Sequence, residues 1–151
     1  MSEVRVRPAT IEDHSIIVEF NQKLAKESED LTLKPEIITP GVEAALRDRS
    51  KATYLIAEVD GRIMGQLMIT TEWSDWRNAD IWWIQSVYVH PEARRQGIFK
   101  SLYFKAREMA QEKGVASLRL YVERENLTAQ RAYEKLGMTQ SHYVMMEESL
   151  R

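Results

Sequence analysis

Residues 87–102 join an apolar strand to a helix, and they read Val87-Tyr88-Val89-His90-Pro91-Glu92-Ala93-Arg94-Arg95-Gln96-Gly97-Ile98-Phe99-Lys100-Ser101-Leu102. Pro91 ends the strand because proline has no backbone N–H for a sheet hydrogen bond. Apolar residues then recur at helical spacing, which predicts a helix with a buried stripe. The stripe consists of Ile98, Leu102, Ala106, Met109 and Ala110, and Gly114 predicts where the helix ends.

The junction between this strand and this helix has the properties of an anion site. The first N–H groups of a helix lack intrahelical partners and carry partial positive charge, so phosphate groups bind there. Gly97 allows a close backbone approach, while Arg94, Arg95 and Lys100 supply full charges. One glycine is a weak signal, so on spacing alone an ordinary strand-to-helix turn with solvated arginines is an equal alternative.

The same stretch resembles the acetyl-CoA-binding motif of the GNAT superfamily of N-acetyltransferases. The family pattern is an Arg or Gln, two residues, Gly, one residue, then Gly or Ala, and here Arg94, Gly97 and Phe99 occupy the three positions. Phe99 departs from the pattern: its N–H can still serve a phosphate, but its ring must point away from the ligand.

The resemblance implies which residues bind acetyl-CoA. The pyrophosphate would be held by the loop residues Arg94, Arg95, Gln96, Gly97, Ile98, Phe99 and Lys100. The pantetheine arm would lie along the strand and hydrogen-bond the backbone of Val87, Tyr88 and Val89. One of those N–H groups would polarise the thioester carbonyl.

A second spaced set, Asn126, Ala129, Tyr133 and Gly137, resembles the other GNAT signature. Taken alone, these residues also suit an N-cap, two core positions and a C-cap. The resemblance implies that Asn126 contacts the pantetheine arm and that Tyr133 lies near the sulfur. A tyrosine there would be the catalytic residue that assists departure of the thiolate.

Length and composition limit the class of protein. The chain has 151 residues, 44% of them hydrophobic and 29% charged, which predicts one domain over residues 1–151. A formal net charge of −2 argues against nucleic acid as a partner. The absence of cysteine excludes disulfides, thiolate zinc sites and a cysteine nucleophile, and it suits a cytoplasmic location. The three scattered histidines predict no metal site, and no apolar run suggests a signal peptide or membrane contact.

Hydrophobic periodicity predicts the remaining elements. Strands are expected at residues 4–7, 54–59, 62–73, 81–89, 118–122 and 143–146, and helices at about 10–26, 41–49, 98–113 and 126–136, with 28–40 as a loop. Gly65 predicts a bulge or a close backbone approach, and Thr10 with Asp13 resembles a capping box. This order predicts an α/β (α+β) fold in which a mixed, mostly antiparallel sheet is flanked by about four helices. It is also the element order of the GNAT fold.

The acceptor end and the general base are less clearly marked. The acceptor is predicted to contact Glu27, Trp73, Trp76, Trp83 and Gln85, because acids beside aromatic rings suit a cationic amine. A solvated loop, core packing or a homodimer interface would explain the same residues. Some relatives carry a Glu where this strand has Gln85, which cannot accept a proton. Glu123 is a candidate base, although a solvated strand-end charge is the simpler interpretation.

These observations predict an acetyl-CoA-dependent N-acetyltransferase that acts on a primary amine of a small molecule. The amine would attack directly in a ternary complex, since no covalent nucleophile is evident. Two alternatives stay open: a protein or peptide N-acetyltransferase, and a non-catalytic acyl-CoA-binding sensor, which Phe99 and Gln85 favour.

Overall fold

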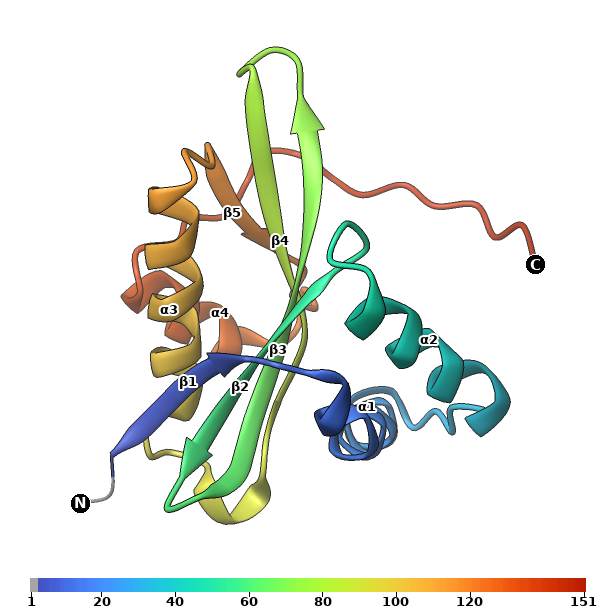
Figure 1. Ribbon diagram of the computed structural model, residues 1–151. Coiled ribbons are helices and arrows are strands. Elements are labelled where there is room, and N and C mark those ends of the chain that lie inside the picture. The colour runs from blue at the N-terminus through green and yellow to red at the C-terminus, as the bar shows by residue number, and fades with distance from the viewer. Residues whose placement is uncertain (1–2) are drawn as a thin grey trace. The chain divides into compact units, whose positions relative to one another are not determined.

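The computed structural model describes residues 3–151, which divide into two compact units on either side of the Tyr121–Val122 bond (Figure 1). The first unit contains a sheet and three long helices. Its strands are β1 (Val4–Pro8), β2 (Thr53–Val59), β3 (Arg62–Ser74), β4 (Ala79–Val89) and β5 (Ser117–Leu120). Its helices are α1 (His14–Glu29), α2 (Pro35–Arg47) and α3 (Ile98–Glu112), with 3₁₀ turns η1 (Ile11–Asp13) and η2 (Pro91–Ala93). The second unit contains α4 (Leu127–Lys135).

The sheet has the order β1-β2-β3-β4-β5. The pairings from β1 to β4 are antiparallel, and β4 pairs with β5 in parallel. The predicted mixed, mostly antiparallel sheet is therefore confirmed. β5 pairs with β4 only from Ile81 to Ile84, whereas β4 continues to Val89. Within the first unit, β4 thus keeps an edge beyond Ile84 that β5 leaves unpaired.

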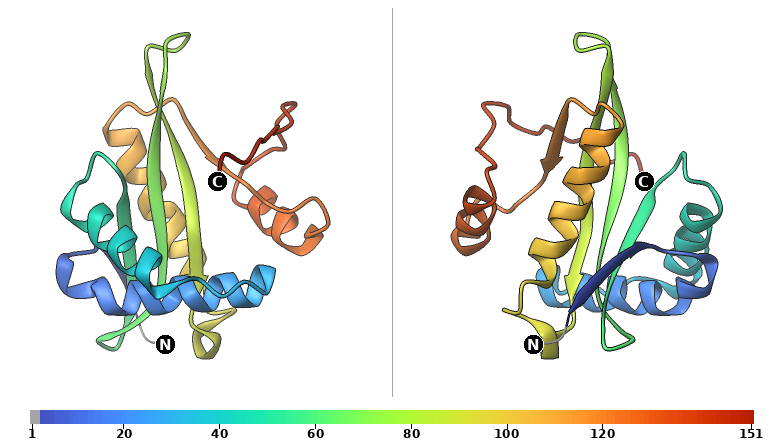
Figure 2. Two further views of the ribbon diagram at one scale, coloured as in Figure 1. Left: turned by 90° about the vertical axis from the view of Figure 1, so that its right-hand side faces the viewer. Right: turned by 60° about the vertical axis from the view of Figure 1, so that its left-hand side comes forward.

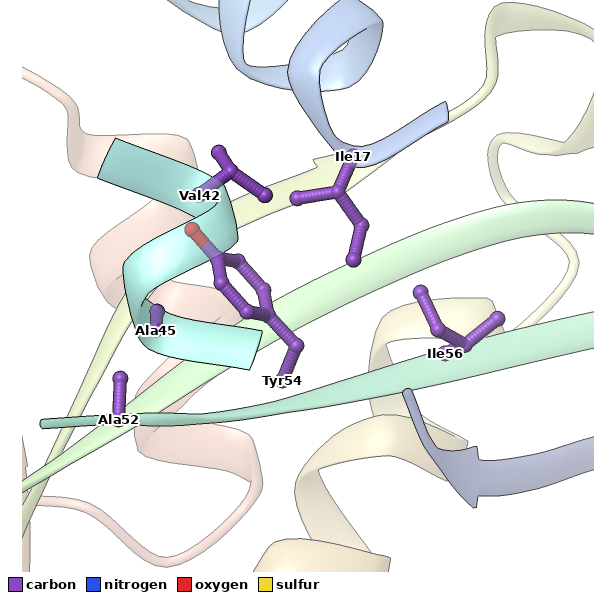
Figure 3. Packing of buried hydrophobic residues seen from close by; sticks show 6 residues of the cluster. All are labelled: Ile17, Val42, Ala45, Ala52, Tyr54 and Ile56. Atoms are coloured by element: carbon purple, nitrogen blue, oxygen red, sulfur yellow. The ribbon is translucent and has the colours of Figure 1, made fainter. Parts of the chain in front are cut away.

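Helices cover both faces of this sheet. Figures 1 and 2 show α3 against one face and α1 with α2 against the other. Figure 3 shows Tyr54 and Ile56 of β2 pointing toward Ile17 of α1 and Val42 of α2, and all four side chains are buried. The core on the α1–α2 side is thus built from alternate positions of β2, as a period of two requires.

Gly65 allows α3 to lie close to the sheet, as its position in β3 predicted. A Cβ added to Gly65 would come within 2.6 Å of Ile98 Cγ2. The β2–β3 register also shifts beside it, so both predicted explanations for this glycine apply. The predicted capping box is present as well, with Thr10 N–H donating to Asp13 Oδ2 over 2.8 Å.

Two sequence-based predictions were wrong. Helix α2 begins at Pro35, within the segment predicted as a loop, rather than at Gly41. Proline at the first helical position loses no hydrogen bond, because that N–H has no intrahelical partner. The strand predicted at 143–146 is absent: residues 143–146 have no strand structure and are exposed. Four consecutive apolar residues do not alternate, and no strand among the described residues pairs with them.

Candidate active site

The loop between β4 and α3 forms a basic hollow. After β4 the chain makes the η2 turn, and Gly97 then caps α3 with a φ of 79°. Arg95 is also in the left-handed region, with a φ of 68°. An open hollow of about 200 Å³ is lined by Val89, Ala93, Arg94, Arg95, Gly97, Ile98, Phe99 and Lys100. The structure therefore gathers the predicted phosphate-loop residues in one place, apart from Gln96, whose amide donates to the Glu92 carbonyl.

The start of α3 adds backbone donors to this hollow. The first backbone bond of the helix runs from the Ser101 N–H to the Gly97 carbonyl over 3.0 Å. The helical hydrogen-bond pattern therefore begins at Ser101, as expected for a helix whose first residue is Ile98. The first turn carries no acidic residue, and Lys100 stands within it. Partial and full positive charge thus meet at one helix end, which favours a phosphate group.

Arg94 connects this loop to the end of α1. Its Nη2 donates to Glu27 Oε1 over 2.7 Å, and its Nε donates to the Val89 carbonyl over 3.0 Å. The Tyr88 hydroxyl donates to Glu27 Oε2 over 2.7 Å, and the guanidinium lies 5.5 Å from the Tyr88 ring centroid. Glu27, predicted as an acceptor contact, therefore lies beside two residues predicted to bind the cofactor.

This network fixes the protonation of its members. The hydrogen bonds from Arg94 and then from Tyr88 lower the pKa of Glu27. Burial, followed by the Glu27 hydrogen bond, raises the pKa of Tyr88 to about 12. At neutral pH, Glu27 is a carboxylate with both oxygens engaged, and Tyr88 is a neutral phenol. Such a carboxylate is a poor general base.

A bulge interrupts β4 just before this network. Opposite β3, the register passes from Tyr88 paired with Gln66 to Gln85 paired with Met68, and Ser86 has a φ of 50°. The Gln66 Nε2 donates to the Ser86 carbonyl over 3.0 Å. Gln66 is fully buried, and its Oε1 is a buried acceptor without a hydrogen-bond partner among the described residues. Such an atom lowers stability by about 1–3 kcal/mol.

Sequence reasoning missed Gln66, although a signal was present. Residues 63–69 form an almost wholly apolar run, and Gln66 is the polar residue at its centre. A buried amide in such a run needs a partner, so it predicts a hydrogen bond to irregular backbone nearby. The distant bulge that supplies this partner could not be located from sequence.

The other four predicted acceptor residues separate into two groups. Gln85 and Trp83 belong to β4: Gln85 donates to Thr70 Oγ1 over 2.6 Å, and Trp83 Nε1 donates to Glu72 Oε1 over 2.8 Å. Trp83 also stacks on Tyr121, with ring centroids 4.6 Å apart. Trp73 and Trp76 lie instead at the tip of the β3–β4 hairpin, which projects beyond the other strands (Figure 1), and they are 62% and 89% exposed.

Glu72, Arg119 and Tyr121 were also missed by the sequence analysis. Arg119 lies 5.8 Å from the Trp83 ring centroid and 3.6 Å from Glu72 Oε2, so it closes a small polar cluster around the tryptophan. The partners come from β3 and from the chain around β5, and only the fold brings them together. The cluster offers an aromatic surface bordered by a carboxylate and a guanidinium.

The second unit contains the other predicted signature. Asn126 caps α4, its Oδ1 accepting from the Ala129 N–H over 3.1 Å, and Gly137 follows the helix with a φ of 107°. Tyr133 is half-buried, and burial raises the pKa of its phenol, which is therefore protonated at neutral pH. The local roles as caps are thus confirmed. Contacts of Asn126 and Tyr133 with a cofactor, and a role for exposed Glu123 as a base, stay predictions.

Within residues 3–151, no three His, Cys, Asp or Glu side chains gather closely enough to hold a metal ion. Over the same range, no helix combines the length and apolar character needed to cross a bilayer.

Comparison with known proteins finds a solved structure that matches nearly the whole chain and curated relatives that match part of it. A structure of a possible acetyltransferase from Clostridium difficile 630 is 40% identical, has a TM-score of 0.92, and matches over 98% of both chains. A Bacillus subtilis (strain 168) protein, proposed to be a ribosomal protein bS18-alanine N-acetyltransferase, is 33% identical over 62% of this chain and 58% of its own length. The thialysine N-epsilon-acetyltransferase of Bos taurus is 35% identical over 50% of this chain and 44% of its own length.

The chain therefore aligns with only about half the length of these two curated relatives. The family model described as "Acetyltransferase (GNAT) family" matches residues 17–138, from α1 to the residue after Gly137. That range includes the basic hollow, the β4 bulge and helix α4. Because this match covers most of the chain and the structure has the same fold as its 40% identical neighbour, the protein belongs to the acetyltransferase (GNAT) family.

Proposed function

We propose that residues 1–151 act as one N-acetyltransferase domain that transfers the acetyl group of acetyl-CoA to a primary amine of a small molecule. The observation that carries this proposal is the basic hollow at the start of α3, which follows directly from the part of β4 that β5 leaves unpaired. A phosphate site joined to an open strand edge suits a ligand with a pyrophosphate and an extended amide-containing arm.

Each part of acetyl-CoA has a group to receive it. The pyrophosphate would accept from the N–H groups of residues 96–100 and pair with Arg95 and Lys100. The pantetheine arm would run beside Val87–Val89 and form strand-like hydrogen bonds there. Arg94 contributes less directly, because its side chain is already engaged by Glu27 and the Val89 carbonyl.

The transfer needs no covalent enzyme intermediate. A neutral amine attacks the thioester carbon, and the carbonyl electron pair moves to oxygen, where a β4 N–H stabilises it. The C–S bond then breaks as the carbonyl re-forms, and the thiolate takes a proton from Tyr133 or from water. The amine nitrogen releases its proton to solvent or to a carboxylate. Neither Gln85 nor the engaged Glu27 suits that last role.

The cluster around Trp83 supports an acceptor with an apolar body and a positive charge. Trp83 and Tyr121 offer aromatic surface, and the Glu72 carboxylate lies next to them. A small diamine or amino acid would fit this chemistry, and the bovine relative is named for thialysine. The Bacillus relative, named for an alanine of a ribosomal protein, favours a protein N-terminus as the second candidate.

Release of free thiol from acetyl-CoA across a panel of amines tests the proposal. The panel should include diamines, amino acids and peptides that begin with alanine, with acetyl-CoA binding followed separately by calorimetry. Turnover with small amines would support the first candidate, and turnover with peptides alone would support the second. Tight binding without turnover on any amine would indicate an acyl-CoA sensor, and no binding would refute all three.

A further inference from the structure

The β4 bulge lies where the unpaired edge of β4 begins, and one peptide unit dominates its geometry. Ser86 and Val87 together oppose a single residue of β3, since the register passes from Gln66–Tyr88 to Met68–Gln85. Ser86 adopts a φ of 50°, which rotates the Ser86–Val87 peptide relative to the regular ladder. The orientation of this peptide decides where the Val87 N–H points.

Gln66 fixes that orientation from β3. Its Nε2 donates to the Ser86 carbonyl over 3.0 Å. If the Gln66 amide were rotated by 180°, its Oε1 would face the Ser86 carbonyl oxygen, and neither oxygen can donate a hydrogen bond. The contact with Ser86 therefore identifies the amide nitrogen of Gln66. In a trans peptide the C=O and N–H point in opposite directions. Gln66 therefore holds the Val87 N–H in an orientation that points away from the Gln66 side chain.

Glutamine at position 66 is not the residue that would give the highest stability. Gln66 is fully buried opposite Ile56 of β2, and its Oε1 has no hydrogen-bond partner among the described residues. A methionine would fill a similar volume without burying an unpaired oxygen. A buried polar residue such as Gln66 in an apolar core, with one atom unpaired, indicates a functional constraint.

We infer that Gln66 is a positioning residue: it holds the Ser86–Val87 peptide so that the Val87 N–H donates to the thioester carbonyl oxygen of bound acetyl-CoA. This inference rests on the proposed function. The N–H stabilises the negative charge that develops on that oxygen when the amine attacks, and the charge returns to form C=O as the C–S bond breaks. Gln66 touches neither substrate, so its effect passes through the backbone it orients.

The test compares Gln66→Met with a matched control, Asn21→Leu. Asn21 is the other buried amide among residues 3–151, and its Nδ2 donates to the Ile17 carbonyl of α1 and to the Tyr54 hydroxyl of β2 rather than to the β4 backbone. Infrared difference spectra of acetyl-CoA, labelled with ¹³C at the carbonyl, report polarisation of the thioester without an acceptor amine. Thermal unfolding, calorimetric affinity for acetyl-CoA, and kcat with the best amine complete the measurements.

The positioning role predicts a dissociation between activity and stability. Gln66→Met should lose most of the shift of the carbonyl stretch that wild type imposes, and kcat should fall about 10-fold to 100-fold, because a donor that is misaligned loses less than one that is deleted. Melting temperature should stay close to that of wild type, because removal of the unpaired Oε1 offsets the loss of the hydrogen bond to the Ser86 carbonyl. Acetyl-CoA affinity should also stay close to that of wild type. Asn21→Leu should leave the carbonyl stretch unchanged.

A conservative variant provides a rescue. In Gln66→Glu, the protonated carboxyl can still donate to the Ser86 carbonyl, whereas the ionised form cannot. The carbonyl shift in this variant should therefore decrease as pH rises, a response that wild type lacks. This comparison also decides the question if Gln66→Met does not fold.

The outcomes separate the two hypotheses. If wild type does not bind acetyl-CoA, the proposed function fails. If wild type binds and polarises the thioester but Gln66→Met does so equally, or if Gln66→Met loses stability and keeps its kcat, Gln66 is structural and the inference is wrong.

Discussion

Gly97→Val tests the phosphate loop most directly, because the structure separates its effect on acetyl-CoA binding from its effect on stability. Gly97 has a φ of 79°, and a Cβ added there meets no atom within 4 Å. The Cβ of valine would therefore not clash with the protein, but the side chain would stand where the hollow is open. Its backbone would also be strained, since the left-handed region is less favourable by about 1–2 kcal/mol for residues other than glycine.

Gly114 supplies a matched control at the other end of α3. Its φ is 70°, and a Cβ there also meets nothing within 4 Å. Valine at either position should thus lower stability by a similar amount, about 1 kcal/mol once the reduced freedom of the unfolded chain is subtracted. Only Gly97 lines the basic hollow. Acetyl-CoA affinity should fall by about 1–3 kcal/mol in Gly97→Val, which corresponds to roughly 5-fold to 150-fold.

Calorimetric titration with acetyl-CoA and thermal unfolding of both variants provide the measurements. A folded Gly97→Val protein with wild-type affinity would refute the assignment of the loop to the pyrophosphate. An equal loss of affinity in Gly114→Val would attribute the effect to a destabilised helix instead.

Three further predictions address catalysis and stability. Tyr133→Phe should lower kcat about 10²-fold to 10⁴-fold while acetyl-CoA affinity is retained, and a near-normal kcat would reduce Tyr133 to a packing residue. With a basic amine of pKa about 10.4, kcat/KM should climb past neutral pH, and Gln85→Glu should flatten the climb; a wild-type profile level from pH 6.5 upward would reveal an unidentified base. The hydrogen bond from Arg7, opposed by burial but aided by the hydrogen bond from the Thr10 N–H, lowers the pKa of Asp13. The stabilisation from the Asp13 carboxylate is therefore present above the usual carboxyl pKa and is lost as pH falls through the lowered value. Denaturant unfolding between about pH 5 and pH 2 should therefore show a steeper loss of stability in wild type than in Asp13→Asn, and parallel curves would contradict this.

The order of elements could be predicted because its signals are local. Pro91 ends β4, Gly97 begins α3 and Asp60-Gly61 makes the β2–β3 turn, each through backbone preferences that a short window reveals. The start of α2 was mispredicted because proline is common both in loops and at the first position of a helix, and Pro35 occupies that first position. A residue that is common both in loops and at helix ends therefore does not by itself locate the boundary of a helix.

The contacts within the site could not be predicted, because they join distant parts of the chain. Glu27 and Arg94 are 67 residues apart in sequence. Glu27 was predicted to contact the acceptor amine and Arg94 to contact the pyrophosphate, so no contact between them was expected. The bulge at Ser86 likewise falls at the polar pair Gln85-Ser86 of a mostly apolar strand, but this pair does not identify its partner Gln66, which is 20 residues away. Such pairs depend on sheet register, which a single sequence specifies only after the strands are paired.

The backbone itself shows where the chain departs from what stability alone would favour. Within residues 3–151, five residues other than glycine have a positive φ: Asp30, Asp60, Asn78, Ser86 and Arg95. The first three are Asp or Asn, which tolerate the left-handed region, and they stand at a helix end or in hairpin turns. Ser86 and Arg95 have no such tolerance. They bracket the segment of β4 and its loop that we assign to the pantetheine arm and the pyrophosphate. Strain of this kind persists only where surrounding structure holds it, so its placement favours the β4–α3 segment as the part of the fold on which function has acted.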